Sequence, residues 1–267
     1  MRPAVFILGA RGSLPISRQD SLKYGGATLC IFMRLADQPI VLDAGTGILD
    51  LPNLLYSDDT DVSILLSHSH VDHLLGIPMC PTMFDPKQTL HIYGAERNGM
   101  RVREQLRTLM SPPLWPIPVE SVGATVTFHS MESSFKLGSV RVDTMDGIHP
   151  NGVTLFRLTG DGKTVVYMTD CTLTESFFSK ATEFARDCDL LLCDGQYNEE
   201  EWASRSHFGH NTWTAAARLA AAANAKQARI IHHDPFRTDV ELDAAAKELT
   251  NIYPGCAFAR AGEEITL

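Results

Sequence analysis

Short apolar runs separated by turn residues recur along the whole chain and predict alternating strands and helices. In the first part of the chain, four runs have the β-branched and aliphatic character of buried strands. They cover residues 5–8, 27–35, 39–42 and 62–66. A helix ending near Leu55 is expected between the last two of these strands.

The same pattern continues to the carboxyl end. Further strands are predicted at residues 90–93, 124–129, 140–145, 154–158, 165–169, 190–193, 229–231 and 256–259. Helices are predicted at residues 97–110, 176–187, 212–223 and 239–251. Residues 111–118, with four prolines that lack N–H donors, are expected to form a stiff surface loop carrying Trp115.

Both halves of the chain show strand runs followed by strand–helix alternation. Helices that cover two sheets on their outer faces make a four-layer αββα sandwich the simplest packing, in the α/β (α+β) class. No linker or low-complexity tract interrupts the 267 residues, so we expect one domain over residues 1–267.

The amino-acid composition restricts which binding partners and which cellular compartment we expect for this chain. The net charge of -9 opposes an electrostatic grip on a long phosphate backbone. The six cysteines are scattered without a C-x-x-C pair and are interpreted as reduced thiols of a cytoplasmic protein. Residues 1–10 are too short to span a membrane and are more typical of a strand than of a signal peptide.

The candidate chemistry centres on the sequence S-H-S-H-V-D-H, from Ser67 to His73, at the end of a predicted strand. Extended backbone can point His68, His70 and Asp72 in one direction, and His73 can join them only if the chain begins to coil there. Imidazole and carboxylate groups bind zinc, iron or manganese. One ion cannot easily use four groups from one short loop, so the spacing indicates two neighbouring ions.

Three more positions place similar groups at the end of a strand or turn. His149 follows the predicted strand 140–145, Asp170 follows 165–169, and His232 and His233 follow 229–231. Together with the histidine loop, these residues could supply three ligands to each of two ions and one shared carboxylate.

From Val41-Leu42-Asp43-Ala44-Gly45-Thr46-Gly47 to His232-His233-Asp234-Pro235, the chain resembles the metallo-β-lactamase superfamily. Within it, the chain is most similar to the branch of ribonuclease Z and small phosphodiesterases. The resemblance implies the αββα fold and a carboxylate at Asp43 that braces the loops. It also implies two metal sites with these ligands: His68, His70 and His149 for one ion, Asp72, His73 and His232 for the other, and Asp170 bridging them. His233 remains an alternative to His232.

A second resemblance concerns Gly209-His210-Asn211-Thr212, which is similar to the Gly-His-Ser-Thr of ribonuclease Z relatives. It implies that His210 is a general acid and that Asp194, at a strand end, orients it. The alternatives are that His210 merely precedes a helix N-cap, or that His207 takes the acid role. His91 and His129 lie inside predicted strands and are interpreted as structural.

These features predict a hydrolase in which metal-activated hydroxide attacks a small phosphodiester, with a cyclic nucleotide or another cyclic phosphate among the candidates. Asp72 is expected both to bind metal and to orient the water. The tRNA enzymes of the branch carry a long arm before the bridging aspartate, and the 21 positions between His149 and Asp170 leave no room for one. The alternatives are a lactone, β-lactam or other ester hydrolase, a tRNA 3′-processing endonuclease without the arm, an iron-dependent oxidative enzyme, or a non-catalytic binding module.

The expected cofactors are two divalent ions, zinc first, with manganese or iron accepted by the same ligands. The expected partner is a small phosphodiester rather than a long nucleic acid or a membrane, and relatives of this kind often form homodimers. Trp115 is a candidate lid or stacking residue, or a rim aromatic packed on its own loop. Arg11 and Lys23, near glycine turns, are candidates for steering phosphate.

Overall fold

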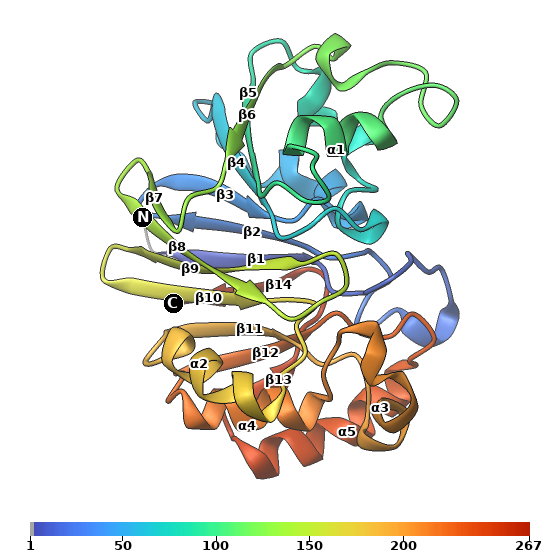
Figure 1. Ribbon diagram of the computed structural model, residues 1–267, viewed down its shortest axis with the longest axis vertical. Coiled ribbons are helices and arrows are strands. Elements are labelled where there is room, and N and C mark those ends of the chain that lie inside the picture. The colour runs from blue at the N-terminus through green and yellow to red at the C-terminus, as the bar shows by residue number, and fades with distance from the viewer. Residues whose placement is uncertain (1–2) are drawn as a thin grey trace.

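The computed structural model describes residues 3–267 and contains two seven-stranded sheets packed face to face (Figure 1). The first sheet has the order β14 (Glu263–Thr266), β1 (Ala4–Gly9), β2 (Cys30–Leu35), β3 (Gln38–Leu42), β4 (Asp61–Leu66), β5 (Thr89–Gly94), β6 (Thr125–Ser130). The second has the order β13 (Cys256–Phe258), β12 (Gln227–Ile231), β11 (Leu190–Asp194), β10 (Lys163–Met168), β9 (Val153–Gly160), β8 (Val140–Gly147), β7 (Ser134–Leu137). The first two residues of the predicted segment 1–10 lie outside the described residues.

Each sheet combines an antiparallel half with a parallel half. In the first sheet β3, β4, β5 and β6 run parallel, and in the second β10, β11, β12 and β13 do. Parallel neighbours place their carboxyl ends at the same edge of a sheet, which is where open α/β sheets bind ligands. The loops that follow β3, β4, β10, β11 and β12 therefore meet at one end of the molecule.

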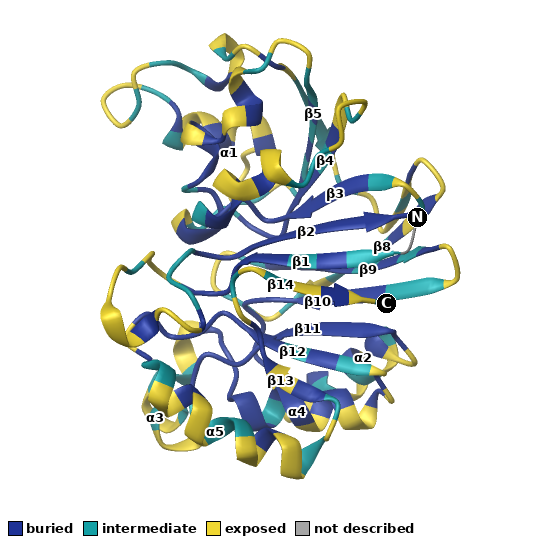
Figure 2. Cartoon of the chain, turned by 180° about the vertical axis from the view of Figure 1, so that it is seen from behind, coloured by how far each residue is buried: buried dark blue, intermediate teal, exposed yellow. Residues whose placement is uncertain are grey.

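Three apolar clusters make the four layers predicted from the sequence. One fills the space between the sheets, with Ile31 and Leu42 on one side and Leu158 and Leu192 on the other. Another lies beneath α1 (Val102–Leu109) and several short 3₁₀ helices on the outer face of the first sheet. The third lies beneath α2 (Glu175–Ala185), α4 (Trp213–Ala222) and α5 (Asp239–Ile252) on the second sheet. The αββα prediction is confirmed, and Figure 2 shows strands buried between partly exposed helices.

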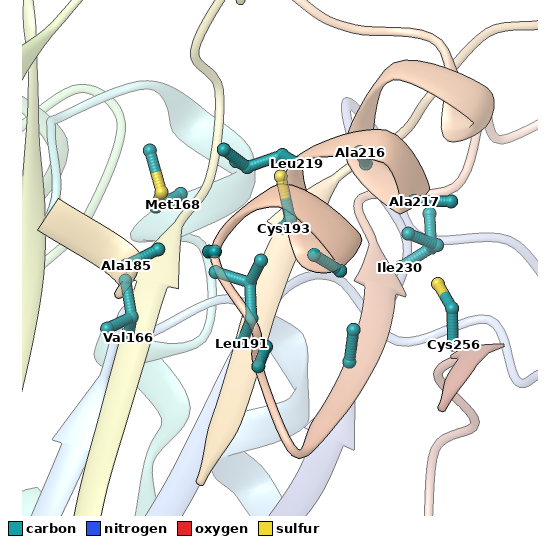
Figure 3. Close-up of a cluster of buried hydrophobic side chains, with 14 of the residues drawn as sticks. Val166, Met168, Ala185, Leu191, Cys193, Ala216, Ala217, Leu219, Ile230 and Cys256 are labelled. Atoms are coloured by element: carbon teal, nitrogen blue, oxygen red, sulfur yellow. The ribbon is translucent and has the colours of Figure 1, made fainter. Parts of the chain in front are cut away.

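Helix α4 approaches the second sheet closely because the residues on its inner face are small. Ala216 and Ala217 lie over Cys193 and Ile230 of the sheet (Figure 3). The helix starts where the Thr212 side chain accepts a hydrogen bond from the backbone N–H of Ala215, 3.1 Å away. This N-cap fixes the direction of the chain that leads into the helix from the candidate site.

The described part of the chain also agrees with two other expectations. All six cysteines are buried and unpaired, as predicted for reduced thiols. None of the helices within residues 3–267 has the length and apolar character needed to cross a bilayer.

Several local predictions were wrong. The helix expected at residues 97–110 begins only at Val102, because Asn98 and Gly99 adopt positive φ and close a tight turn between Arg97 and Met100. Asn-Gly is the pair that such a turn favours. The helix expected before Leu55 is a 3₁₀ helix, Thr46–Asn53. Strands β7 and β14 and helix α3 (Glu199–Arg205) were not predicted.

We expect Asp189→Asn to lower the free energy of unfolding at pH 7 by about 1–3 kcal/mol, because it weakens a buried carboxylate's hydrogen bonds. Asp189 accepts from Lys226 at 2.8 Å, Lys163 at 3.2 Å and the backbone N–H of Thr164 at 2.9 Å. Burial raises the pKa of Asp189, but the lysines and the N–H lower it overall. Its stabilisation is therefore present above the unfolded value of about 3.9 and is lost as pH falls through the lower folded pKa.

Urea unfolding of both proteins at pH 7 and in acid measures this difference. The difference in the free energy of unfolding between wild type and Asp189→Asn should become smaller below about pH 4. The exposed turn residue Asp161 provides the control, since Asp161→Asn should change stability by less than about 0.5 kcal/mol. If the difference in unfolding free energy were as large in acid as at pH 7, the ionised form of Asp189 would not be the source of the stabilisation.

Candidate metal centre

Asp43, which follows β3, braces the loop that follows β4. Its carboxylate accepts hydrogen bonds from the Ser67 backbone N–H and hydroxyl, both 2.7 Å away, and from the Tyr167 hydroxyl at 2.6 Å. It also lies 2.7 Å from Nδ1 of His73. Asp43 is fully buried, so these donors replace the water that an isolated carboxylate would need. The geometry agrees with the bracing role expected for Asp43.

The histidine loop runs from extended backbone into a turn of 3₁₀ helix, Val71–His73. This helical turn brings His73 to the same side as His68, as expected if His73 is to join the other histidines of the loop. The imidazole rings of these two residues lie 4.3 Å apart between centroids, and those of His68 and His70 lie 4.4 Å apart. The loop therefore presents its imidazoles as one cluster.

One group of potential ligand atoms gathers around His68, His70, His149 and Asp170. His149 Nε2 lies 3.1 Å from His70 Nδ1 and 3.7 Å from Asp170 Oδ2. The other ring nitrogen of His149 lies 2.9 Å from the Gly209 carbonyl and donates to it. This bond selects the tautomer whose Nε2 carries a free lone pair, which a metal ligand needs.

A second group gathers around Asp72, His73 and His232. Asp72 Oδ2 lies 3.1 Å from His232 Nε2 and 3.4 Å from His73 Nε2, and it also accepts the Ser13 backbone N–H at 2.7 Å. The Gln196 side-chain oxygen lies 3.1 Å from His232 Nδ1 and accepts its proton, so Nε2 of His232 is directed into the cluster.

Asp170 lies between the two groups and turns one carboxylate oxygen toward each. Its Oδ2 faces Nε2 of His68 at 3.6 Å and of His149 at 3.7 Å. Its Oδ1 faces Nε2 of His73 at 3.4 Å and of His232 at 3.3 Å. A carboxylate in this position could serve both ions at once.

The structure separates the two adjacent histidines that follow β12. The ring of His232 sits over Gly12, where an added Cβ would lie 2.2 Å from it, so only glycine leaves room. His233 turns the other way and donates from Nε2 to the Ala259 carbonyl at 2.8 Å. Burial lowers the pKa of His233 to about 3. His232 is therefore the one of the pair that faces the cluster.

The buried carboxylates give this cluster a negative potential. Burial alone would lower the pKa of His73, but Asp72, Asp170 and Asp43 raise it well above its ordinary value. Burial also opposes protonation of His232, yet Asp170 and Asp72 raise its pKa to about 9. The same carboxylates would favour any cation placed among these atoms.

The donor set fits metal ions. Nε2 of His68 and Nε2 of His73 are buried and have no hydrogen-bond partner, which normally costs free energy. Tetrahedral ligands about 2.0–2.1 Å from an ion lie about 3.3–3.4 Å from one another. The separations of 3.1–3.7 Å within the two groups match that spacing. The chain therefore has His/Asp clusters suited to binding metal ions.

His210 and Asp194 form a buried pair beside the cluster. His210 Nδ1 lies 2.7 Å from Asp194 Oδ2, and the other oxygen of Asp194 accepts the Gln196 backbone N–H at 3.0 Å. These two residues also form a third potential ligand group with Asp170 and His232. Because Nδ1 of His210 is held by Asp194, Nε2 is the ring nitrogen that this pair leaves free.

Two of the cavities that border the cluster reach the histidine loop. The larger, which we call the large cavity, has a volume of about 640 Å³ and is lined by His70, His149 and His210, among others. The smaller has a volume of about 170 Å³ and is lined by His68, His70 and Arg97. His70 borders both, so the two cavities meet at the histidine loop.

Other sequence candidates lie elsewhere. Trp115 packs against the outer core of the first sheet. Arg11 is fully buried and donates to backbone carbonyls, and Lys23 forms an ion pair with Asp243, so neither is placed to steer phosphate.

The remaining three histidines are also outside the cluster. His91 and His129 lie in β5 and β6 and both contact the Thr127 hydroxyl at 2.8 Å, which agrees with a structural role. His207 is exposed, and its ring lies against Phe208 with 4.3 Å between the ring centroids.

Sequence reasoning missed three residues that position the cluster: Tyr167, Ser13 and Gln196. Tyr167 bonds Asp43 from the opposite sheet, 124 positions away. For Ser13 the local signal was the glycine turn around it, and for Gln196 it was the turn-like sequence Asp194-Gly195-Gln196. Tyr167 had no such local signal. Backbone strain marks the same region, since Asp43, Asp170 and His232 all adopt positive φ, which non-glycine residues rarely do.

The comparisons with known proteins agree with this geometry. A family model described as "Beta-lactamase superfamily domain" matches residues 39–233. The chain is 22% identical to a ribonuclease Z of Treponema pallidum (strain Nichols), over 97% of this chain and 96% of that protein. It is 24% identical to the probable metallo-hydrolase YhfI of Bacillus subtilis (strain 168), over 92% of this chain and 93% of that protein.

Solved structures show the same fold. The structure of YhfI from Bacillus subtilis aligns with a TM-score of 0.76 and 22% identity over 99% of this chain and all of that one. A structure titled as a new diphosphatase from the PhnP family aligns with a TM-score of 0.74 and 16% identity, over 100% of this chain and 98% of that one.

Proposed function

The chain belongs to the metallo-β-lactamase superfamily of hydrolases, and on that premise we propose that it is a binuclear phosphodiesterase. Its substrate would be a small phosphodiester, linear or cyclic. The observation that carries the proposal is the buried His210–Asp194 pair, 2.7 Å apart, at the edge of the candidate metal centre. A general acid is needed most when the departing group is a poorly stabilised alkoxide, as in a phosphodiester.

The proposed ligands follow the two groups of atoms described above. His68, His70 and His149 would hold one divalent ion, Asp72, His73 and His232 the other, and Asp170 would bridge them. Imidazole and carboxylate ligands favour zinc, and they also accept manganese or iron. Bound there, the ions would supply Lewis acidity that activates water near neutral pH and neutralises charge on the phosphate oxygens.

The chain's own residues would orient the reactants. Ser13 N–H and His232 hold one oxygen of Asp72 in place, so this carboxylate can orient the attacking water while it also acts as a ligand. Asp194 accepts the Nδ1–H of His210 and fixes the orientation of its ring. His210 can then deliver a proton from Nε2 to the oxygen of the departing alcohol in the large cavity.

Cationic side chains at both cavities support an anionic substrate in a chain whose net charge is -9. Arg97 lines the small cavity and Arg205 lines the large one. Arg97 donates to the Thr154 hydroxyl at 2.8 Å, and its buried Nε has no partner. Guanidinium groups are well suited to phosphate because they offer several donors in one plane.

A paired assay tests this proposal. The same metal-analysed preparation is given bis-(p-nitrophenyl) phosphate, a dialkyl phosphodiester, a lactone and a β-lactam. We expect hydrolysis of the phosphodiesters, loss of activity on chelation and recovery with added zinc or manganese. Turnover of the lactone or the β-lactam alone, at full metal content, would contradict the phosphodiesterase proposal and leave the family assignment standing.

A further inference from the structure

Three exposed apolar side chains border the large cavity: Leu14, Phe208 and Phe236. Their exposed fractions are 57%, 51% and 75%. Single exposed apolar residues are ordinary on a protein surface. Three that line one cavity together with His149 and His210 are more informative, because they adjoin the candidate catalytic groups. We call the two phenylalanines among them, Phe208 and Phe236, the aromatic rim.

The ring of Phe236 is mounted on a fixed turn. The Phe236 backbone N–H donates to the Asp234 side chain at 2.8 Å. From below, the fully buried guanidinium of Arg11 donates to the carbonyl oxygens of Asp234 at 3.0 Å and Arg237 at 2.7 Å. An exposed ring held on a rigid turn loses little conformational freedom when it binds a ligand.

Phe208 is fixed relative to the proposed acid. It ends a 3₁₀ helix, Ser206–Phe208, and is followed by Gly209 with φ of +88°. An added Cβ at Gly209 would lie 2.4 Å from His149 Nδ1, and the Gly209 carbonyl accepts the proton of that nitrogen. His210 comes next in the chain. The position of Phe208 is therefore tied both to a proposed metal ligand and to the proposed acid.

The walls of the large cavity are polar as well as aromatic. Arg205 lies 3.5 Å from Asp234 and over the ring of Tyr197 at 5.4 Å, and Gln196 also lines the space. A saturated acyl chain would leave these donors and acceptors unpaired. A flat ring with hydrogen-bonding edges can stack on the aromatic side chains and also form hydrogen bonds with the polar ones. A cavity of about 640 Å³ has the size of a small-molecule site.

We propose that the aromatic rim binds the nucleobase of a nucleotide substrate, with the base against Phe208 and Phe236 and the phosphate at the metal centre. This inference rests on the proposed phosphodiesterase function and names the substrate class within it. Phe208 and Phe236 set the preference for a substrate that carries a base over one that does not, because stacking on an aromatic side chain stabilises any base.

Equilibrium binding of two product-like probes to the purified protein tests the proposal. Adenosine 5′-monophosphate and ribose 5-phosphate share the sugar phosphate and differ at C1, which carries the base in the first and a hydroxyl in the second. Wild type should bind the nucleotide about 5- to 150-fold more tightly, the range that one stacked base provides. Phe236→Ala and Phe208→Ala should each reduce this preference several-fold and leave the ribose 5-phosphate affinity unchanged. Phe84→Ala, at an exposed phenylalanine that lines neither cavity, should leave both affinities unchanged.

Equal affinity of wild type for both probes would overturn the proposal, as would a base preference that survives both phenylalanine variants. So would variants that alter only the oligomeric state, because the aromatic rim would then be a subunit contact. The phosphodiester assay separates this inference from the function on which it rests. If the protein hydrolyses phosphodiesters but shows no preference for the nucleotide, only the binding of a base by the aromatic rim is rejected. If it neither hydrolyses phosphodiesters nor prefers the nucleotide, the proposed function is rejected as well.

Discussion

Asp170→Ala is expected to remove bound metal and to reduce phosphodiester turnover by about 10³-fold or more. Asp170 turns one oxygen toward each group of potential ligands, within 3.3–3.7 Å of four imidazole nitrogens. Its loss would remove the one carboxylate shared by both proposed ions. Metal ions contribute several kcal/mol of transition-state stabilisation, and each 1.36 kcal/mol corresponds to a factor of ten in rate.

Metal analysis and steady-state kinetics on the same preparation measure both effects. The matched control is Asp58→Ala, which makes the same change at an exposed surface position and should retain metal and activity. A thermal melt shows that the variant remains folded. A folded Asp170→Ala protein with full metal content and unchanged turnover would remove Asp170 from the site.

The second large effect is expected at His210. His210→Ala should keep its metal ions yet slow esters with poor leaving groups by about 10²–10⁴-fold, the usual contribution of a general acid. Esters of p-nitrophenol should be affected much less, because that leaving group departs without a proton. The measurement is kcat/KM for a series of phosphodiesters that differ in the pKa of the departing alcohol, with metal content determined for each protein.

His207→Ala is the matched control, three positions earlier in the chain. His207 is exposed and contacts Phe208 rather than the metal centre. Its replacement should leave the dependence on leaving group unchanged. Equal slowing of every ester by His210→Ala would argue against an acid role. Loss of metal from the same variant would instead favour the alternative ligand group of His210 with Asp170 and His232.

Much of the cluster could be predicted because strands impose simple geometry. Side chains alternate along extended backbone, so the spacing of His68, His70 and Asp72 already implied a shared direction. Strands β8 and β10 both pair antiparallel with β9 and so run in the same direction, and β12 runs parallel to them. Their carboxyl ends therefore lie at the same edge, which brings together His149, Asp170 and His232 although they lie far apart in sequence. The structure brings all seven of the predicted ligand residues into two adjoining groups.

Contacts between residues far apart in the sequence could not be predicted from the pattern of strands. The hydrogen bond from Tyr167 to Asp43 crosses between the sheets and depends on how they stack. The choice between His232 and His233 depends on the space above Gly12. Helix α3 was missed because none of its residues is buried and it therefore has no apolar face. Its capping box, Asn198 with Glu201, was the available signal.

The central claim is that this cluster holds a pair of metal ions. Anomalous X-ray scattering from crystals grown with zinc or manganese tests it most directly. We expect two peaks about 3.5–4 Å apart, one among His68, His70 and His149, the other among Asp72, His73 and His232, with Asp170 between them. No peak at these residues after soaking, or metal bound only elsewhere on the chain, would contradict the account.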